Sequence, residues 1–70
     1  MAVLAQGRVA WYCANLGYGF ILPEDGGTKA FVRRKDIVAG EEENLENNAR
    51  VSYEVTQGTE GPEAMNVYKA

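Results

Sequence analysis

Histidine is absent from the 70-residue sequence, and cysteine occurs only once, as Cys13. Histidine is the commonest acid–base catalyst and the commonest metal ligand, and a single cysteine cannot form an internal disulfide or a thiolate cluster. We therefore expect a protein that is not an enzyme, that has no metal site or other cofactor, and that works in a reducing cytoplasm. A lone cysteine in a strand is more often a small packed residue than a redox switch, so we assign Cys13 to packing.

Long apolar runs are also absent. No stretch approaches the roughly 20 apolar residues that cross a bilayer, and residues 1–7 carry no basic residue and are too short for a signal peptide. These features predict a soluble, unexported protein without membrane attachment. We expect a single domain over residues 1–70 with a thin core, because so short a chain hides only about 60% of its unfolded surface.

Basic residues are outnumbered: ten Asp and Glu stand against seven Lys and Arg, which gives a net charge of -3 and a pI near 4.8. This balance argues against nucleic-acid binding, because domains that bind nucleic acid are usually basic. The local field at a binding surface matters more than the net charge, however. Most of the carboxylates follow position 36, whereas five basic residues precede it: Arg8, Lys29, Arg33, Arg34 and Lys35.

Glycine and proline punctuate the chain, and short runs rich in β-branched and aromatic residues lie between them. This pattern predicts strands at residues 6–15, 18–22, 29–32, 50–57 and 63–68, with a turn at 23–27. Residues 38–48 have poor helix propensity and are expected to form a long acidic surface loop, preceded by a short turn at 35–37. Five short strands indicate an all-β fold, a small closed or nearly closed barrel.

The stretch Gly17-Tyr18-Gly19-Phe20-Ile21 is the most informative for function. Strand alternation sends Tyr18 and Phe20 to one face, about 7 Å apart, and the two glycines and Ile21 to the other. Rings spaced in this way can stack successive nucleic-acid bases, each worth roughly 1–3 kcal/mol. The alternative is that both rings belong to the core.

The number of aromatic residues favours the binding interpretation. Other apolar residues suffice for a small core, namely Val9, Ile21, Val32, Ile37, Val51, Val55 and Val67, together with Tyr53, which shares a strand face with Val51 and Val55. The remaining aromatic residues are surplus to that core: Trp11, Tyr12, Tyr18, Phe20 and Phe31. An exposed group of this kind more often marks a binding surface than an accident.

These motifs resemble, in their order and spacing, those of bacterial cold-shock proteins over nearly the whole chain. The matching segments are Gly7-Arg8-Val9-Ala10-Trp11-Tyr12, residues 17–21, Ala30-Phe31-Val32-Arg33, Val51-Ser52-Tyr53-Glu54-Val55 and residues 61–67. The resemblance implies a small five-stranded antiparallel OB-fold barrel that binds single-stranded RNA and DNA, as an RNA chaperone or as a regulator of transcription or translation. It also implies the contact residues, with base stacking at Trp11, Tyr12, Tyr18, Phe20 and Phe31 and further contacts at Asn15, Arg33 and Arg34.

The sequence departs from the cold-shock pattern at several contact positions. Ala10 and Leu16 replace lysines, Glu60 replaces a basic residue, and Glu41-Glu42-Glu43 occupies a loop that often carries an aromatic residue. Arg33 and Arg34 work in the other direction, because a guanidinium plane can stack on a base and pair with phosphate. The alternative function is therefore a divergent barrel with weak or lost nucleic-acid binding that acts through a protein partner. We expect a monomer, and a strand-swapped dimer is the alternative.

Overall fold

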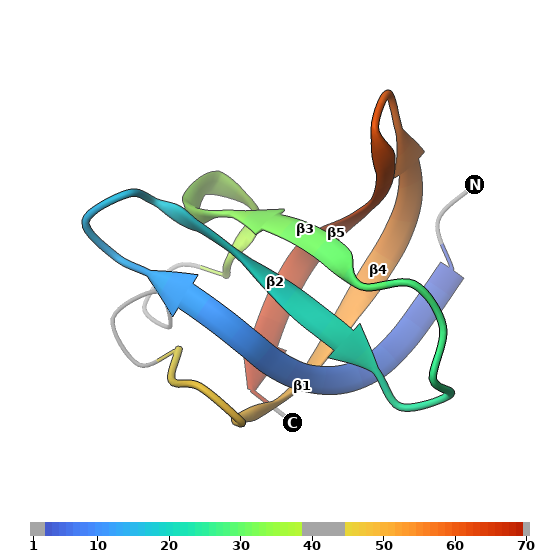
Figure 1. Cartoon of the computed structure of the whole chain (residues 1–70), viewed down its shortest axis with the longest axis horizontal. Helices are drawn as coiled ribbons and strands as arrows, with labels where there is room; N and C mark the ends of the chain where they lie inside the picture. The colour runs from blue at the N-terminus through green and yellow to red at the C-terminus, as the bar shows by residue number, and fades with distance from the viewer. Residues whose placement is uncertain (1–2, 39–44, 70) are drawn as a thin grey trace.

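The chain folds into five strands and one short 3₁₀ helix in a computed structural model that describes residues 3–38 and 45–69 (Figure 1). The elements are β1 (Val3–Cys13), β2 (Tyr18–Pro23), β3 (Ala30–Arg33), η1 (Arg34–Asp36), β4 (Arg50–Gly58) and β5 (Gly61–Lys69). Each predicted strand is present, and the turn expected at 35–37 is largely η1. The loop expected at 38–48 lies mostly outside the described residues, at 39–44. None of the helical structure within the described ranges is long and apolar enough to cross a membrane.

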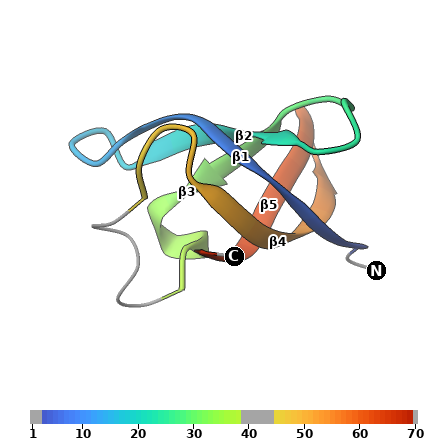
Figure 2. The same cartoon turned by 90° about the horizontal axis from the view of Figure 1, so that it is seen from below.

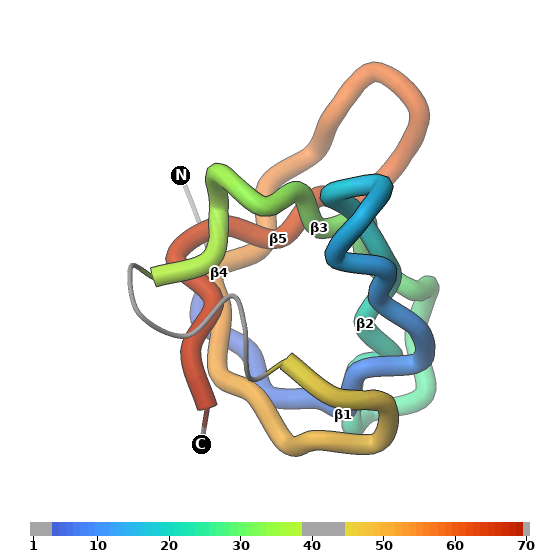
Figure 3. Tube along the Cα trace, turned by 90° about the vertical axis from the view of Figure 1, so that its left-hand side faces the viewer, coloured from blue at the N-terminus to red at the C-terminus, as the bar shows by residue number. Residues whose placement is uncertain are grey.

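The strands form a closed barrel in the order β1-β2-β3-β5-β4, which Figure 3 shows as a ring. Four of the pairings are antiparallel, whereas β3 and β5 pair in parallel, with Phe31 opposite Glu63. Neighbours in a closed ring of five strands cannot alternate in direction all the way round, because five is odd. The antiparallel arrangement expected from the sequence is therefore correct for four pairings and cannot hold for the fifth.

Strand β1 links the two sides of the barrel. Its first part, from Val3 to Arg8, pairs with β4, and its second part, from Gly7 to Cys13, pairs with β2. Figure 2 shows β1 and β2 together on one side and β4 and β5 on the other, with η1 near the end of β5. The barrel thus has two outer faces, one formed by β1, β2 and β3 and the other by β4, β5 and the beginning of β1.

Aliphatic side chains fill most of the core. All but one of the predicted core residues are buried, and the exception, Val55, is only partly buried. The buried ones are Val9, Ile21, Val32, Ile37, Val51, Tyr53 and Val67. Leu45 is also buried, at 6% exposure, although it lies in the segment expected to form a surface loop. Acidic and amide neighbours gave its segment the pattern of a solvated loop, but this single apolar side chain packs into the core cluster.

Tyr53 brings a polar atom into this core. Its side chain is 1% exposed, and its hydroxyl has no hydrogen-bond partner among the residues that the structure describes. Burial raises the pKa of Tyr53 above its ordinary value of about 10, and the carboxylates of Asp25 and Glu24 raise it further. The phenol is therefore neutral at ordinary pH and contributes through packing.

Candidate nucleic-acid interface

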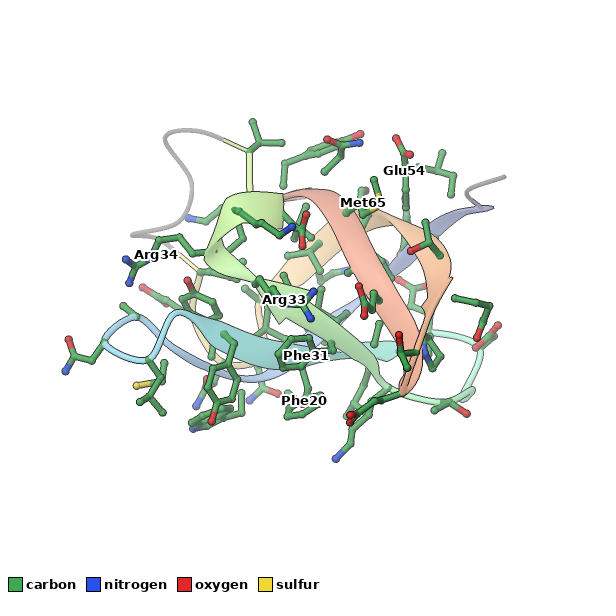
Figure 4. The ribbon with its side chains drawn as sticks, turned by 90° about the horizontal axis from the view of Figure 1, so that it is seen from above. Phe20, Phe31, Arg33, Arg34, Glu54 and Met65 are labelled. Carbon is green, nitrogen blue, oxygen red and sulfur yellow. The ribbon has the colours of Figure 1, made fainter. Side chains whose placement is uncertain are left out.

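Four aromatic rings from β1, β2 and β3 are joined by successive ring contacts; we call Trp11, Tyr18, Phe31 and Phe20 the aromatic row. Ring centroids are 5.6 Å apart between Trp11 and Tyr18, 5.5 Å between Tyr18 and Phe31, and 5.5 Å between Phe31 and Phe20. The strand register creates this row, because Phe20 stands opposite Trp11 on β1 and opposite Phe31 on β3. Figure 4 shows Phe20 and Phe31 next to each other.

The rings of the aromatic row are accessible. Trp11 is 40% exposed, and the other three are half-buried. Gly19 and Ile21, which alternate with Tyr18 and Phe20 along β2, are buried. The predicted division of β2 into an aromatic face and a core face is therefore confirmed, and neither Tyr18 nor Phe20 belongs to the buried core.

A bulge in β1 places Trp11 in the aromatic row. The pairing with β2 passes from Val9–Ile21 directly to Trp11–Phe20, so Ala10 is an extra residue in β1. In a regular strand Val9 and Trp11 would face the same side. The bulge instead leaves Val9 fully buried and turns Trp11 outward.

The same bulge turns Tyr12 inward. Its side chain packs against the core, and its hydroxyl is buried with no hydrogen-bond partner within residues 3–38 and 45–69. The resemblance to cold-shock proteins implied base stacking at both Trp11 and Tyr12, although neighbouring residues of a strand face opposite sides. The structure separates the two residues, and we leave Tyr12 out of the interface.

Gly19 lets β1 lie close behind the aromatic row. A Cβ atom at this position would overlap the carbonyl oxygen of Trp11 and the Cα of Tyr12. A glycine in a strand interior often marks such a close approach of a second backbone. Gly19 thus helps to position Trp11 through the backbone.

Two cationic side chains lie over rings of the aromatic row. Lys29 Nζ is 4.6 Å from the centroid of Phe20, and Arg33 Cζ is 4.8 Å from the centroid of Phe31. Both distances fall within the roughly 6 Å over which a ring face attracts a cation. Arg33 therefore lies at the aromatic row as the sequence predicted, and Lys29, noted in the sequence only for its charge, joins it.

Arg34 and Asn15 lie at the edge of this surface. The Arg34 guanidinium donates a hydrogen bond to the carbonyl of Ala14, and its backbone N–H donates to the Gly17 carbonyl at 2.9 Å. Arg34 thereby ties η1 to the turn between β1 and β2, and Figure 4 shows it away from Phe20 and Phe31. Asn15 is an exposed residue of the same turn. A role for either residue in binding remains a prediction.

A groove beside Phe20 and Phe31 has an acidic wall, which we define as Glu60 and Glu63. The groove has a volume of about 620 Å³, and its lining consists of Phe20, Phe31, Arg33, Thr59, Glu60, Gly61, Pro62 and Glu63. Glu63 forms an ion pair with Arg33, whose Nη1 lies 3.2 Å from Glu63 Oε1. Acidic residues from the second half of the chain therefore lie beside the basic residues of the first half. Residues 41–43, the other acidic segment, lie outside the described residues.

The family model described as 'Cold-shock' DNA-binding domain matches residues 5–70. The chain belongs to the cold-shock domain family. The resemblance inferred from the motifs is thereby confirmed, and members of this family generally bind nucleic acid. This cold-shock domain is 44% identical over 64 residues to the "Cold shock protein" of Arthrobacter globiformis, a match that covers 91% of this chain and 96% of that protein. It is 40% identical over 62 residues to the "Cold shock-like protein CspE" of Escherichia coli K12, covering 89% and 90%.

A solved structure, "drosophila Unr CSD456", has the same fold as this cold-shock domain. The two superpose with a TM-score of 0.78 at 19% sequence identity. The match covers 97% of this chain and 27% of that chain, so this cold-shock domain spans about a quarter of the solved chain. At this identity the likeness concerns the fold alone, and it agrees with the five-stranded OB-fold barrel.

Proposed function

We propose that this cold-shock domain, a single domain over residues 1–70, binds single-stranded RNA and DNA by stacking bases on the aromatic row. The continuity of the row carries the proposal, because each ring centroid lies 5.5 or 5.6 Å from the next. Successive unpaired bases can stack on such a surface whatever their identity, and each contributes roughly 1–3 kcal/mol.

The residues of the aromatic row take the bases, and the cations beside them take the backbone. Lys29 and Arg33 supply positive charge next to Phe20 and Phe31, and Arg33 also offers a planar guanidinium on which a base can stack. Asn15 and Arg34 extend the contact surface at its edge. Binding then traps strands in their unpaired form by mass action, which needs neither ATP nor a catalytic group. This action suits a cytoplasmic RNA chaperone or a regulator of transcription or translation.

The acidic wall reduces the positive charge beside the aromatic row. Glu63 already neutralises part of the charge of Arg33, and Glu60 stands in the same groove. Few phosphate contacts mean that few counterions are released on binding. We therefore expect binding that depends mainly on stacking and only weakly on salt concentration.

Quenching of Trp11 fluorescence by a short oligothymidine, titrated at two salt concentrations, tests the proposal. Trp11 is the only tryptophan of the chain and is 40% exposed at one end of the aromatic row. Saturable quenching with a shallow salt dependence is the expected result. No quenching at low salt, from a protein whose circular dichroism shows it to be folded, would refute the proposal.

A second candidate function is a protein-interaction module, which the acidic wall favours. An exposed aromatic surface bordered by Glu60 and Glu63 suits a basic, partly apolar peptide better than a polyanion. Such a partner would be recovered by the wild type after nuclease treatment and lost with Phe20→Ala plus Phe31→Ala. A blank in that experiment counts against this function. In either role we propose a monomer, and light scattering distinguishes it from a strand-swapped dimer.

A further inference from the structure

The acidic wall lies in the groove beside Phe20 and Phe31, two of the rings on which the proposed function stacks bases. Glu60 and Glu63 line the same groove as Phe20 and Phe31, and the parallel pairing of β3 with β5 sets Glu63 directly opposite Phe31. A base stacked on either ring presents its hydrogen-bonding edge sideways, because the edge lies in the plane of the stacked ring. If bases stack here as in the proposed function, on which this inference rests, the chemistry of the acidic wall decides which base edges the groove accepts.

The carboxylate of Glu63 has a defined position at the edge of the groove. Its Oε1 is paired with Arg33 Nη1 at 3.2 Å, and Arg33 Cζ lies 4.8 Å from the centroid of Phe31. Its Oε2 lies over Gly58, where a Cβ atom would overlap it. Glu63 therefore offers an acceptor beside the aromatic row that its ion pair with Arg33 orients.

Glu60 adds a second acceptor to the same wall. It is exposed, and it forms no ion pair with another residue in the described part of the chain. An ionised carboxylate only accepts hydrogen bonds. The wall thus presents acceptors to whatever edge faces it, and a base that presents an acceptor there meets repulsion between like partial charges.

We infer that the acidic wall makes the groove select bases with an exocyclic amino group, and that it favours cytosine over uracil. Cytosine carries an N4 amino donor, which Glu and Asp side chains recognise by accepting its hydrogen bond. Uracil carries the O4 acceptor at the same position. Its N3–H donor lies between O2 and O4, so a carboxylate that approaches this donor also approaches two acceptors. The O2 acceptor is common to both bases, so Arg33 cannot discriminate between them through it.

Oligodeoxycytidine and oligodeoxyuridine of equal length provide a matched pair of probes. The two carry the same charge and sugar, and their bases have the same ring size without a methyl group. General electrostatic and phosphate effects therefore cancel in the ratio of their affinities. At neutral pH we expect the wild type to bind the cytidine strand about tenfold more tightly, because a hydrogen bond to a charged acceptor is the main difference.

Two variants locate the origin of this ratio. In Glu63→Gln and Glu60→Gln the new amide both donates and accepts, so it serves either base, and the ratio should fall towards one. Glu54→Gln is the matched control, because Glu54 lies on the opposite side of the barrel (Figure 4) and is bonded to Asn66 there. This control should keep the ratio of the wild type.

Each outcome is decisive. A preference for cytidine that shrinks in Glu63→Gln or in Glu60→Gln and persists in Glu54→Gln supports the inference. Equal affinity for both strands, or tighter binding of the uridine strand, overturns the inference and leaves the proposed function standing. A cytidine preference that neither wall variant reduces also overturns it, because the wall is then not its cause. Failure of the folded wild type to bind either strand refutes the proposed function itself.

Discussion

The two outer faces of the barrel both expose apolar side chains, but within residues 3–38 and 45–69 only the face of β1, β2 and β3 groups aromatic rings in contact with one another. On the face of β1, β2 and β3, each ring of the aromatic row lies within 5.6 Å of a neighbour, and cations cover two of the rings. On the other face Leu4 and Met65 are exposed, but Glu54 stands between them in the sheet register. Figure 4 shows Glu54 and Met65 on the side away from Phe20 and Phe31. The faces therefore differ in the contiguity and chemistry of their exposed side chains.

Removing rings from the face of β1, β2 and β3 is the most direct test of this difference between the two faces. Phe20→Ala plus Phe31→Ala should weaken binding of a labelled oligothymidine by about 1–3 kcal/mol for each ring removed, because two stacking surfaces are lost. Leu4→Ala plus Met65→Ala, on the other face, should leave binding unchanged. Fluorescence anisotropy measures both, with circular dichroism to verify folding. Equal losses from the two pairs would mean that the faces do not differ in function.

The packing behind the aromatic row gives the next largest effect. Gly19→Ala should lower the free energy of unfolding by about 1–3 kcal/mol, because its new methyl group overlaps the backbone of β1. It should also weaken binding in the molecules that fold, since Trp11 is displaced. Gly26→Ala is the control: its site is open, and its φ of +80° leaves only a backbone cost of about 1–2 kcal/mol. Urea denaturation and anisotropy report the two effects separately, and unchanged binding by Gly19→Ala would contradict the assigned role.

A core substitution should separate stability from binding. Tyr53→Phe removes a buried hydroxyl without a described partner, so the free energy of unfolding at neutral pH should rise by about 1 kcal/mol, with binding unaffected. The raised pKa means that folded Tyr53 keeps its proton at pH values where the unfolded chain loses it. The wild type should therefore lose stability as the pH rises above about 10, and Tyr53→Phe should lose less.

Tyr68→Phe is the control for this substitution, because Tyr68 is 42% exposed. The free energy of unfolding of the Tyr68→Phe variant should follow that of the wild type across the same pH range. If Tyr53→Phe shows the same alkaline loss as the wild type, the phenol of Tyr53 is not its source.

Reversing one charge of the acidic wall should give the smallest effect. Glu60→Lys should tighten oligonucleotide binding a few-fold. It should also steepen the slope of the logarithm of the association constant against the logarithm of salt concentration by about 0.7, the value for one added phosphate contact on a single strand. Glu54→Lys changes the net charge equally on the other face. If both variants steepen the salt dependence alike, net charge and not the position of the wall governs binding.

Much of the aromatic face followed from local sequence pattern. Alternation along residues 18–22 correctly separated Tyr18 and Phe20 from the core, and the alternating segment 50–57 correctly assigned Val51 and Tyr53 to it. Tyr12 was misplaced because a single extra residue, Ala10, inverts the phase of β1. Nothing in the local pattern marks such a bulge, since it arises from pairing with β2.

The acidic wall was harder to predict, because it depends on how the barrel closes. Glu63 lies 30 positions after Arg33 in the chain, yet the two form an ion pair. The parallel pairing of β3 with β5 brings them together, and no spacing in the sequence encodes that pairing. In the sequence, Glu60 stands out only as a departure from the family pattern. This departure places Glu60 near the binding surface but indicates no partner for it.

The parallel pairing of β3 with β5 is also the shortest strand pairing of the barrel. Strands β3 and β5 meet in register at one pair of residues, Phe31 and Glu63, whereas β4 and β5 remain paired from Val51–Lys69 to Gly58–Gly61. An oligonucleotide in the groove would hold β3 through Phe31 and β5 through the acidic wall. The bound strand would then stabilise the pairing of β3 with β5, while the barrel keeps that strand unpaired.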